Sequence, residues 1–209
     1  MPQGGLAAQP LDHPGKAPHT RAMTLLALDS RWRRFNAPDR VCPCCGRQFS
    51  GIYDIGFDAP DDWPHRPRPD ENDLEIGDDR LGPEFCRIGA RYFLRAVLTL
   101  PLRGSDDGFS FGPWVEVPET VFRAYLATVD NPDQPFGPAE GLLANALPLF
   151  EDEADSAVTL TLPDPAQRPQ VTATDGPLAE AQAQGISFDD LLEIYAACGD
   201  DIRPHLAAD

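Results

Sequence analysis

The 209-residue sequence has no long apolar run. No stretch approaches the roughly 18–20 apolar residues that cross a bilayer, so we expect no membrane-spanning helix. Leu25–Leu28 is too short for the core of a signal peptide, and no small-residue cleavage site follows it. We therefore expect a cytoplasmic protein with reduced thiols, which favours metal binding or redox chemistry over disulfides for its cysteines.

Histidine is also scarce, and the common catalytic motifs are absent. The four histidines are His13, His19, His65 and His205, and three of them lie in expected tails. A histidine general base in a formed pocket is therefore not expected. The sequence contains no Walker loop, G-x-G-x-x-G, H-E-x-x-H or G-x-S-x-G motif. Acidic pairs are frequent, but none stands out in so acidic a chain.

The charge is strongly negative and unevenly distributed. The net charge is −17, with +4 in residues 1–49 and −21 in residues 50–209. An acidic body repels nucleic acids and anionic membranes, and attracts basic proteins or metal cations. Solubility alone is the simpler explanation of the same charge. Nucleic-acid binding through the basic N-terminal residues is disfavoured by the acidity of the body.

Composition divides the chain into four parts. Residues 1–22 are rich in Pro and Gly without periodicity, and are expected to be a disordered leader or a mis-called extension before Met23. Residues 23–40 form a basic arm, either solvated or folded onto the acidic body. Residues 41–199 are expected to be a single globular domain, and residues 200–209 a frayed tail.

Periodicity predicts an α+β fold, a mainly antiparallel sheet with a few packed helices and an N-terminal cysteine knuckle. Residues 58–84 are expected to be a long loop, and residues 141–149 a helix or an irregular segment. The predicted strands are 52–57, 85–88 with 92–100, 111–117, 158–162 and 168–174. The predicted helices are 119–129, 178–184 and 188–198, the last with a capping box at Ser187 and Asp190.

The cysteine-rich turn is the strongest chemical signal. Cys42, Pro43, Cys45 and Gly46 form the Cys-Pro-x-Cys-Gly turn that is typical of zinc knuckles, in which both sulfurs point at one ion. Two ligands are then missing. The candidates are Cys44, Cys86, His65 and a carboxylate such as Asp58 or Asp61. We prefer Cys86, because its predicted strand would lie beside the knuckle if the two strands paired.

Two other interpretations of the cysteines stay open. They can be reduced core residues without a metal, as we expect for Cys198 on the last helix. They can also be redox-active, in which case Cys42 and Cys45 would exchange, since a disulfide between the adjacent Cys44 and Cys45 would be strained.

The acidic residues that follow the knuckle are a candidate partner surface. Asp54 and Asp58 flank Ile55–Gly56–Phe57 and are the only acids embedded in an apolar stretch beside the knuckle, and Asp61 ends the same segment. They could contact a partner or support the cysteine ligands. The alternative is that they are carboxylates that cap turns.

A series of motifs over residues 41–176 resembles a known family. They are C-x-C-C-G at Cys42–Gly46, DIGFDAPD at Asp54–Asp61, a strand cysteine at Cys86, F-x-R-x-x-L-x-x-P-x-x-G-S-D at Phe93–Asp106, G-x-W-V at Gly112–Val115, L-x-N-x-L-P at Leu143–Pro148 and Q-R-P at Gln167–Pro169. The chain resembles domain of unknown function 2199, an uncharacterised bacterial family. The Pro-rich residues 62–80 depart from its charged helical run. The resemblance implies one domain with a shared fold and brings no activity.

Three classes of function follow from these observations. The first is a non-enzymatic binding protein with a structural zinc knuckle and an acidic surface for an unknown, basic protein partner. An immunity or antitoxin-like protein that masks a basic toxin is a specific version of it. The second is a metal- or thiol-dependent enzyme that uses the cysteine cluster. The third is a nucleic-acid binder.

Overall fold

The computed structural model describes residues 25–67 and 73–207, so the expectation for residues 1–22 lies outside the described residues. The helical elements are η1 (Leu25–Leu28), α1 (Ser30–Phe35), α2 (Glu119–Asp130), η2 (Glu151–Glu153), α3 (Gly176–Gln184), α4 (Phe188–Ala197) and α5 (Arg203–Ala207). The strands are β1 (Ile55–Gly56), β2 (Leu74–Ile76), β3 (Asp79–Leu81), β4 (Phe85–Ile88), β5 (Arg91–Arg95), β6 (Leu98–Pro101), β7 (Gly108–Gly112), β8 (Trp114–Val117), β9 (Ala139–Leu143), β10 (Ala157–Thr161) and β11 (Gln170–Ala173).

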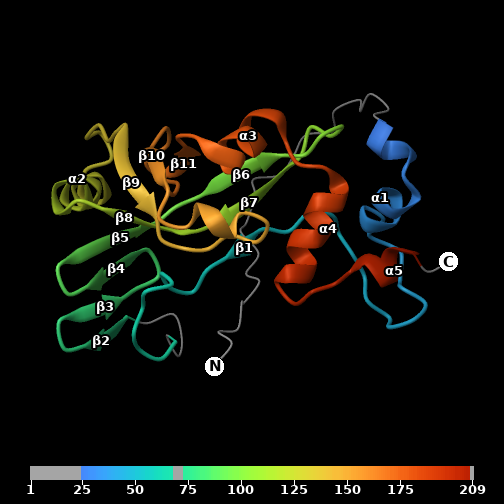
Figure 1. Cartoon of the computed structure of the whole chain (residues 1–209), viewed down its shortest axis with the longest axis horizontal. Coiled ribbons are helices and arrows are strands. Elements are labelled where there is room, and N and C mark those ends of the chain that lie inside the picture. The colour runs from blue at the N-terminus through green and yellow to red at the C-terminus, as the bar shows by residue number, and fades with distance from the viewer. Residues whose placement is uncertain (1–24, 68–72, 208–209) are drawn as a thin grey trace.

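A large antiparallel sheet forms one end of the protein (Figure 1). Its strand order is β11-β10-β9-β8-β5-β4-β3-β2, and every neighbouring pair is antiparallel. Helix α2 packs near β4 and β5, where Phe122 contacts the rings of Phe85 and Tyr92. The predicted α+β class with a mainly antiparallel sheet is confirmed.

A small sheet connects the large sheet to the C-terminal helices (Figure 1). Its order is β1-β7-β6, with β1 parallel to β7 and β6 antiparallel to it. Pro113 separates β7 from β8, so the single strand predicted over residues 111–117 contributes to two sheets. The strand that follows the knuckle, β1, therefore pairs in the small sheet and not beside β4.

Helices α1, α4 and α5 gather at the opposite end from the large sheet (Figure 1). Trp32 and Phe35 of α1 are buried against Phe188 and Tyr195 of α4, with ring centroids 5.2–6.2 Å apart. The described part of the basic arm thus folds onto the body, one of its two expected arrangements. No helix among the described residues is both long and apolar enough to cross a bilayer.

Three segments differ from their predicted structure. The expected loop 58–84 contains the hairpin β2–β3, whose turn includes Gly77 at a φ of +64°. Residues 141–149 begin with the end of β9, because β8 and β10 offer pairing partners on both sides and a short apolar run does not reveal its period. The expected tail contains α5, because Ile202 and Leu206 are buried.

The predicted strand 92–100 is divided between β5 of the large sheet and β6 of the small sheet, and only Ile55–Gly56 of the predicted strand 52–57 form a strand. The other predicted elements match the structure. Helix α2 follows the predicted apolar face, and β10 pairs with β11 across the expected turn. Helix α4 begins with the predicted capping box, in which Ser187 and Asp190 each bond the backbone of the other. These elements share strong local signals, since caps and alternation act over a few residues.

The buried hydroxyl of Tyr195 joins α4 to the segment before β1. It accepts a hydrogen bond from the Tyr53 backbone N–H at 3.1 Å and donates one to the Tyr53 carbonyl at 3.0 Å. The two tyrosine rings also stack, with centroids 4.1 Å apart. One side chain therefore satisfies both backbone groups of a residue that lies outside any strand.

We expect Tyr195→Phe to lower the free energy of unfolding by about 1–3 kcal/mol, because both Tyr53 backbone groups would lose their partner. Urea denaturation would measure the change. Tyr125→Phe is the matched control, since Tyr125 is also buried and no hydrogen bond to its hydroxyl occurs among the described residues. An equal loss of stability in the two variants would contradict the role of the hydroxyl.

Candidate functional site

The knuckle is a tight turn closed by backbone hydrogen bonds. The Cys42 N–H donates to the Arg47 carbonyl at 2.8 Å, and the Gly46 N–H donates to the Cys42 carbonyl at 2.9 Å. Gly46 has a φ of +75°, which glycine adopts without the steric cost of a side chain. A bridge between Val41 and Gln48 closes the base of the turn. The three cysteines are thus held on one short loop.

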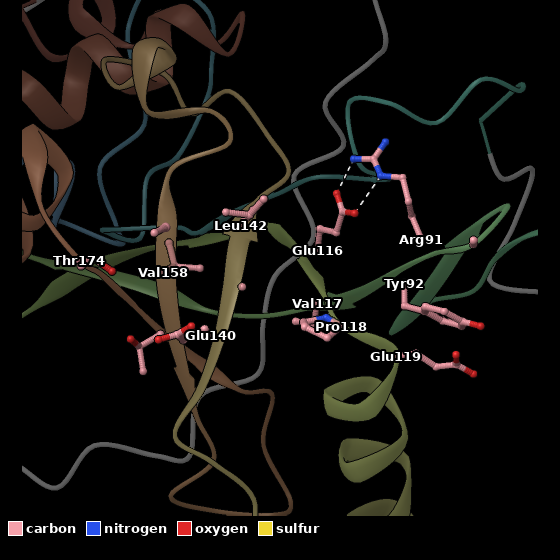
Figure 2. Close-up of a pocket in the computed structure, with 14 residues that line it drawn as sticks. Arg91, Tyr92, Glu116, Val117, Pro118, Glu119, Glu140, Leu142, Val158 and Thr174 are labelled. Atoms are coloured by element: carbon pink, nitrogen blue, oxygen red, sulfur yellow. Dashed lines mark hydrogen bonds and ion pairs between the residues drawn. The ribbon is translucent and has the colours of Figure 1, made fainter.

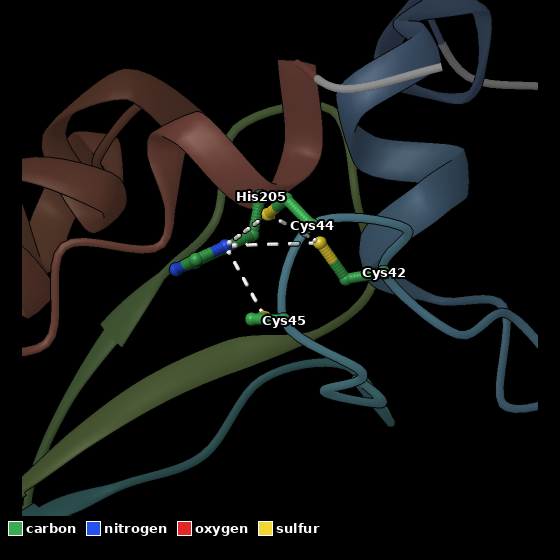
Figure 3. Close-up of side chains that lie close together, drawn as sticks. All are labelled: Cys42, Cys44, Cys45 and His205. Atoms are coloured by element: carbon green, nitrogen blue, oxygen red, sulfur yellow. Dashed lines mark hydrogen bonds between the residues drawn. The ribbon is translucent and has the colours of Figure 1, made fainter.

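Helix α5 brings His205 to this loop. Ile202 and Leu206 anchor the helix in the core, and the half-buried His205 points toward the knuckle (Figure 3). Arg40 donates to the His205 carbonyl at 3.3 Å with both terminal nitrogens. The His205 ring lies 6.3 Å from the ring of Phe49, measured between centroids. Backbone and ring contacts together fix the imidazole.

Cys42, Cys44, Cys45 and His205 form one compact group. Their four ligand atoms all lie within 4.8 Å of one another (Figure 3). The Sγ atoms of Cys42 and Cys44 are 3.1 Å apart. The His205 Nδ1 lies 3.7, 3.2 and 3.5 Å from the Sγ atoms of Cys42, Cys44 and Cys45. Cys42 is buried, whereas Cys44 and Cys45 are exposed.

These distances fit a tetrahedral metal site. With ordinary zinc bond lengths, a tetrahedron places two sulfurs about 3.8 Å apart and a sulfur and a nitrogen about 3.5 Å apart. The three sulfur–nitrogen distances, 3.2–3.7 Å, lie around the value expected for a sulfur and a nitrogen. The distance of 3.1 Å between the Cys42 and Cys44 sulfurs is shorter than the value expected for two sulfurs. The Cys3His group can therefore hold a metal ion with little rearrangement.

One thiol of the group, that of Cys42, is prepared for deprotonation without a metal. The hydrogen bond from the Cys44 thiol, helped by the N–H groups of Cys44 and Cys45, lowers the pKa of Cys42 to about 6. The same hydrogen bond raises the pKa of Cys44 to about 11, because it holds the proton of Cys44. A thiolate is the form that binds metals, so the turn prepares one ligand at neutral pH.

The predicted ligand Cys86 is not part of the group, and this expectation is corrected. Cys86 is buried in β4 at the other end of the protein, where it pairs with Leu81 and Phe93 (Figure 1). Burial raises the pKa of its thiol to about 12. The prediction required the strand after the knuckle to pair beside β4, and that strand pairs with β7 instead.

The other proposed ligands also lie apart from the knuckle. His65 bonds Asp79, with 2.7 Å between Nε2 and Oδ2. Cys198, which was expected to be a core residue and not a ligand, is partly buried at the end of α4, and burial raises the pKa of its thiol to about 11. Sequence analysis missed His205 because it placed this residue in a frayed tail. The available signal was the pair Ile202 and Leu206, spaced four residues apart around the only histidine of the C-terminal part.

The three predicted partner-surface residues have different environments. Asp54 accepts a hydrogen bond from the Ser110 N–H at 2.8 Å. Asp61 accepts bonds from the Asn145 side chain at 2.8 Å and the Ala146 N–H at 2.7 Å. These contacts favour the turn-capping interpretation for both residues. Asp58 is exposed and has no such contact among the described residues.

A cleft with an acidic lining lies on the large sheet (Figure 2). Its volume is about 610 Å³, and its walls come from β5, β8, β9 and β10. Glu116, Glu119 and Glu140 line it against one cation, Arg91, which leaves a formal charge of −2. Arg91 is bonded to Glu116, whereas Glu140 has no ion-pair partner within the part of the chain that the structure describes. The Leu142 side chain is 43% exposed beside it.

We expect the stability of chelator-treated protein to rise between pH 6 and 9 and to fall above pH 9. Cys42 has a folded pKa near 6 against an ordinary value of 9.0, so the folded state binds fewer protons than the unfolded state in the first window. The pKa of Cys44 is raised to about 11, so between pH 9 and 11 the folded state binds more protons than the unfolded state, and stability falls as pH rises. The urea midpoint of unfolding, measured from pH 6 to 11, would report this dependence of stability on pH. Cys42→Ser should flatten the rise below pH 9, and an unchanged slope would contradict the assignment.

Comparison with known proteins places this chain in a family. The family model described as "Uncharacterized protein conserved in bacteria (DUF2199)" matches residues 41–186. No curated protein and no solved structure matches the chain. The matched residues include the knuckle and both sheets but end before α4, so His205 lies outside them. The resemblance seen in the sequence is confirmed, and the protein belongs to the bacterial family DUF2199.

Proposed function

We propose that this protein is a non-enzymatic interaction domain in which a structural zinc ion joins the N-terminal knuckle to the C-terminal helix. The observation that carries the proposal is the convergence of three sulfurs and one imidazole nitrogen within 4.8 Å. Thiolate and imidazole ligands favour zinc over magnesium or calcium, which prefer oxygen.

The number of ligands favours a structural role over a catalytic one. Structural zinc sites have four protein ligands, whereas catalytic sites have three and keep one position for water or substrate. Cys42, Cys44, Cys45 and His205 would fill all four positions. A metal-dependent enzyme would need one of them to leave, so this alternative is the less favoured of the two.

A metal at this position would hold α5 to the body. This helix has five residues, too few for independent stability in water. Leu206 is fully buried, and Arg34 donates a hydrogen bond to its carbonyl at 2.8 Å. Binding of an ion only in the folded state adds its binding free energy to stability.

The acidic cleft is the best candidate for the partner surface. Its excess negative charge and the exposed Leu142 suit a basic segment that also carries apolar side chains. A toxin with such a segment would be one such partner. The cleft replaces Asp54 and Asp61 in this role, because both of those carboxylates already accept hydrogen bonds within the fold.

We expect protein purified without chelator to contain about one zinc ion per chain, and Cys45→Ser and His205→Asn to lose it. Elemental analysis would measure the metal, and hydrogen exchange of the peptide containing residues 203–207 would report on α5. Exchange there should become faster in both variants and after chelation.

Cys198→Ser and His65→Asn are the matched controls, since neither residue lies in the metal group. Wild-type protein without metal would contradict the zinc site. Metal loss with unchanged exchange and unchanged stability would move the interpretation from a structural to a catalytic ion.

We expect a fluorescent peptide of alternating lysine and leucine to bind, and Glu140→Lys to weaken it at least fivefold more than Glu180→Lys. Both substitutions change the net charge equally, but Glu180 lies at a different pocket beside α3. Fluorescence anisotropy would measure the affinities. Equal weakening in the two variants would show attraction by net charge alone, and would remove the cleft from the proposal.

A further inference from the structure

A second pocket, lined by three arginines, shares Tyr92 with the acidic cleft. Its volume is about 450 Å³, and it is formed by β3, β4 and β5 with helix α2. Arg80, Arg87 and Arg123 line it together with Asp73, which pairs with Arg80, while Glu119 of the neighbouring cleft pairs with Arg123. Arg87 is therefore the arginine of the lining that makes no ion pair among the described residues. The chain has only ten Lys or Arg residues after residue 49, against thirty-one acids. Three of these ten cations around one pocket call for a physical explanation.

Two of the three arginines are held in place by carboxylates. Arg80 bonds Asp73 through Nε and one terminal nitrogen. Arg123 bonds Glu119 in the same way, with Nε at 2.9 Å and Nη2 at 2.6 Å from Oε1. In both cases the other terminal nitrogen keeps its donors. The carboxylates thus orient the guanidinium groups and leave hydrogen-bond donors for a further acceptor.

Within the part of the chain that the structure describes, Arg87 makes no ion pair, although its charge acts on the nearby carboxylates of Asp79 and Glu119. Its Nε donates to the Gly89 carbonyl at 2.8 Å, and its guanidinium carbon lies 6.0 Å from the centre of the Tyr92 ring. Among the described residues, neither of its terminal nitrogens makes a hydrogen bond or an ion pair. These two nitrogens form the fork that binds a carboxylate or phosphate in a bidentate manner.

The pocket also has an aromatic wall. Phe122 lies 5.1 Å from Tyr92 and 5.8 Å from Phe85, measured between ring centroids. All three side chains are only partly buried, so their rings present apolar surface to the pocket. Aromatic walls favour planar apolar groups, which stack or pack edge to face against them.

We propose that this pocket binds a small organic anion, a planar aromatic group that carries a phosphate or a carboxylate. The aromatic group packs against Phe122 and Tyr92, and the anionic group is bound by Arg87 with help from Arg123. The volume is in the range that small-molecule sites occupy. The pocket and the metal group lie at opposite ends of the protein (Figure 1), so this site does not depend on the proposed zinc.

The test uses the full chain with 1-naphthyl phosphate and 1-naphthoate as probes, measured by calorimetry. We expect saturable binding of at least one of them, weakened about tenfold or more by Arg87→Gln. The relative affinities of the two probes would show whether the pocket prefers a phosphate or a carboxylate. Neither 1-naphthol nor inorganic phosphate should bind as tightly, because each carries half of the recognised chemistry. Added salt should weaken binding of the charged probes.

Arg103→Gln is the matched control, because this exposed arginine lies at a different pocket with Asp190. The affinity of the Arg103→Gln variant for the probes should stay within about twofold of that of the wild type. The proposal is overturned if neither probe binds, if 1-naphthol binds as tightly as 1-naphthyl phosphate, or if Arg87→Gln and Arg103→Gln have equal affinities. Zinc content should be unchanged in both variants, which separates this result from failure of the metal site.

Discussion

The metal group can form only because the N-terminal knuckle and the C-terminal helix α5 lie in contact. Residues 42–45 contact His205 across 160–163 positions of sequence. Closing a loop of this length costs several kcal/mol of chain entropy, by the logarithmic dependence on loop length. The aromatic contacts of Trp32 and Phe35 with α4 offset this cost, because they hold the two ends together through buried surface. The ligands therefore converge only in the folded chain, and ion binding and folding are linked.

The residues on which the family resemblance rests meet in a second network. The Asn145 side chain accepts a hydrogen bond from the Trp114 N–H and donates to the Ala59 carbonyl and to Asp61. The Trp114 indole donates to the Phe57 carbonyl at 3.0 Å. Three motifs far apart in sequence thus fix the irregular segment 57–61 on the large sheet. Their shared role is to satisfy buried backbone groups, since an unpaired group there would cost about 1–3 kcal/mol.

Sequence reasoning succeeded where the signal is local and failed where it depends on long-range pairing. The knuckle turn, the cap of α4 and the alternation in β10 each act within a few residues. The pairing of β1 with β7 has no local signature, and this single fact removed Cys86 from the metal group. His205 was not predicted as a ligand for a related reason. Helix α5 is too short to be predicted from periodicity, and it is held in place by the burial of Ile202 and Leu206.

Two arginines of the N-terminal arm, Arg34 and Arg40, bond the backbone of the C-terminal helix α5. Arg34 donates to the Leu206 carbonyl and Arg40 to the His205 carbonyl, both in the last turn of α5. Cations are favoured at this end of a helix, because its last carbonyls lack helical partners and carry partial negative charge. Three thiolates around one divalent ion would add a net negative charge nearby, which the same arginines would also offset. The basic arm and the acidic body are therefore complementary parts of one fold, and the positive charge of residues 1–49 is used in part within the molecule.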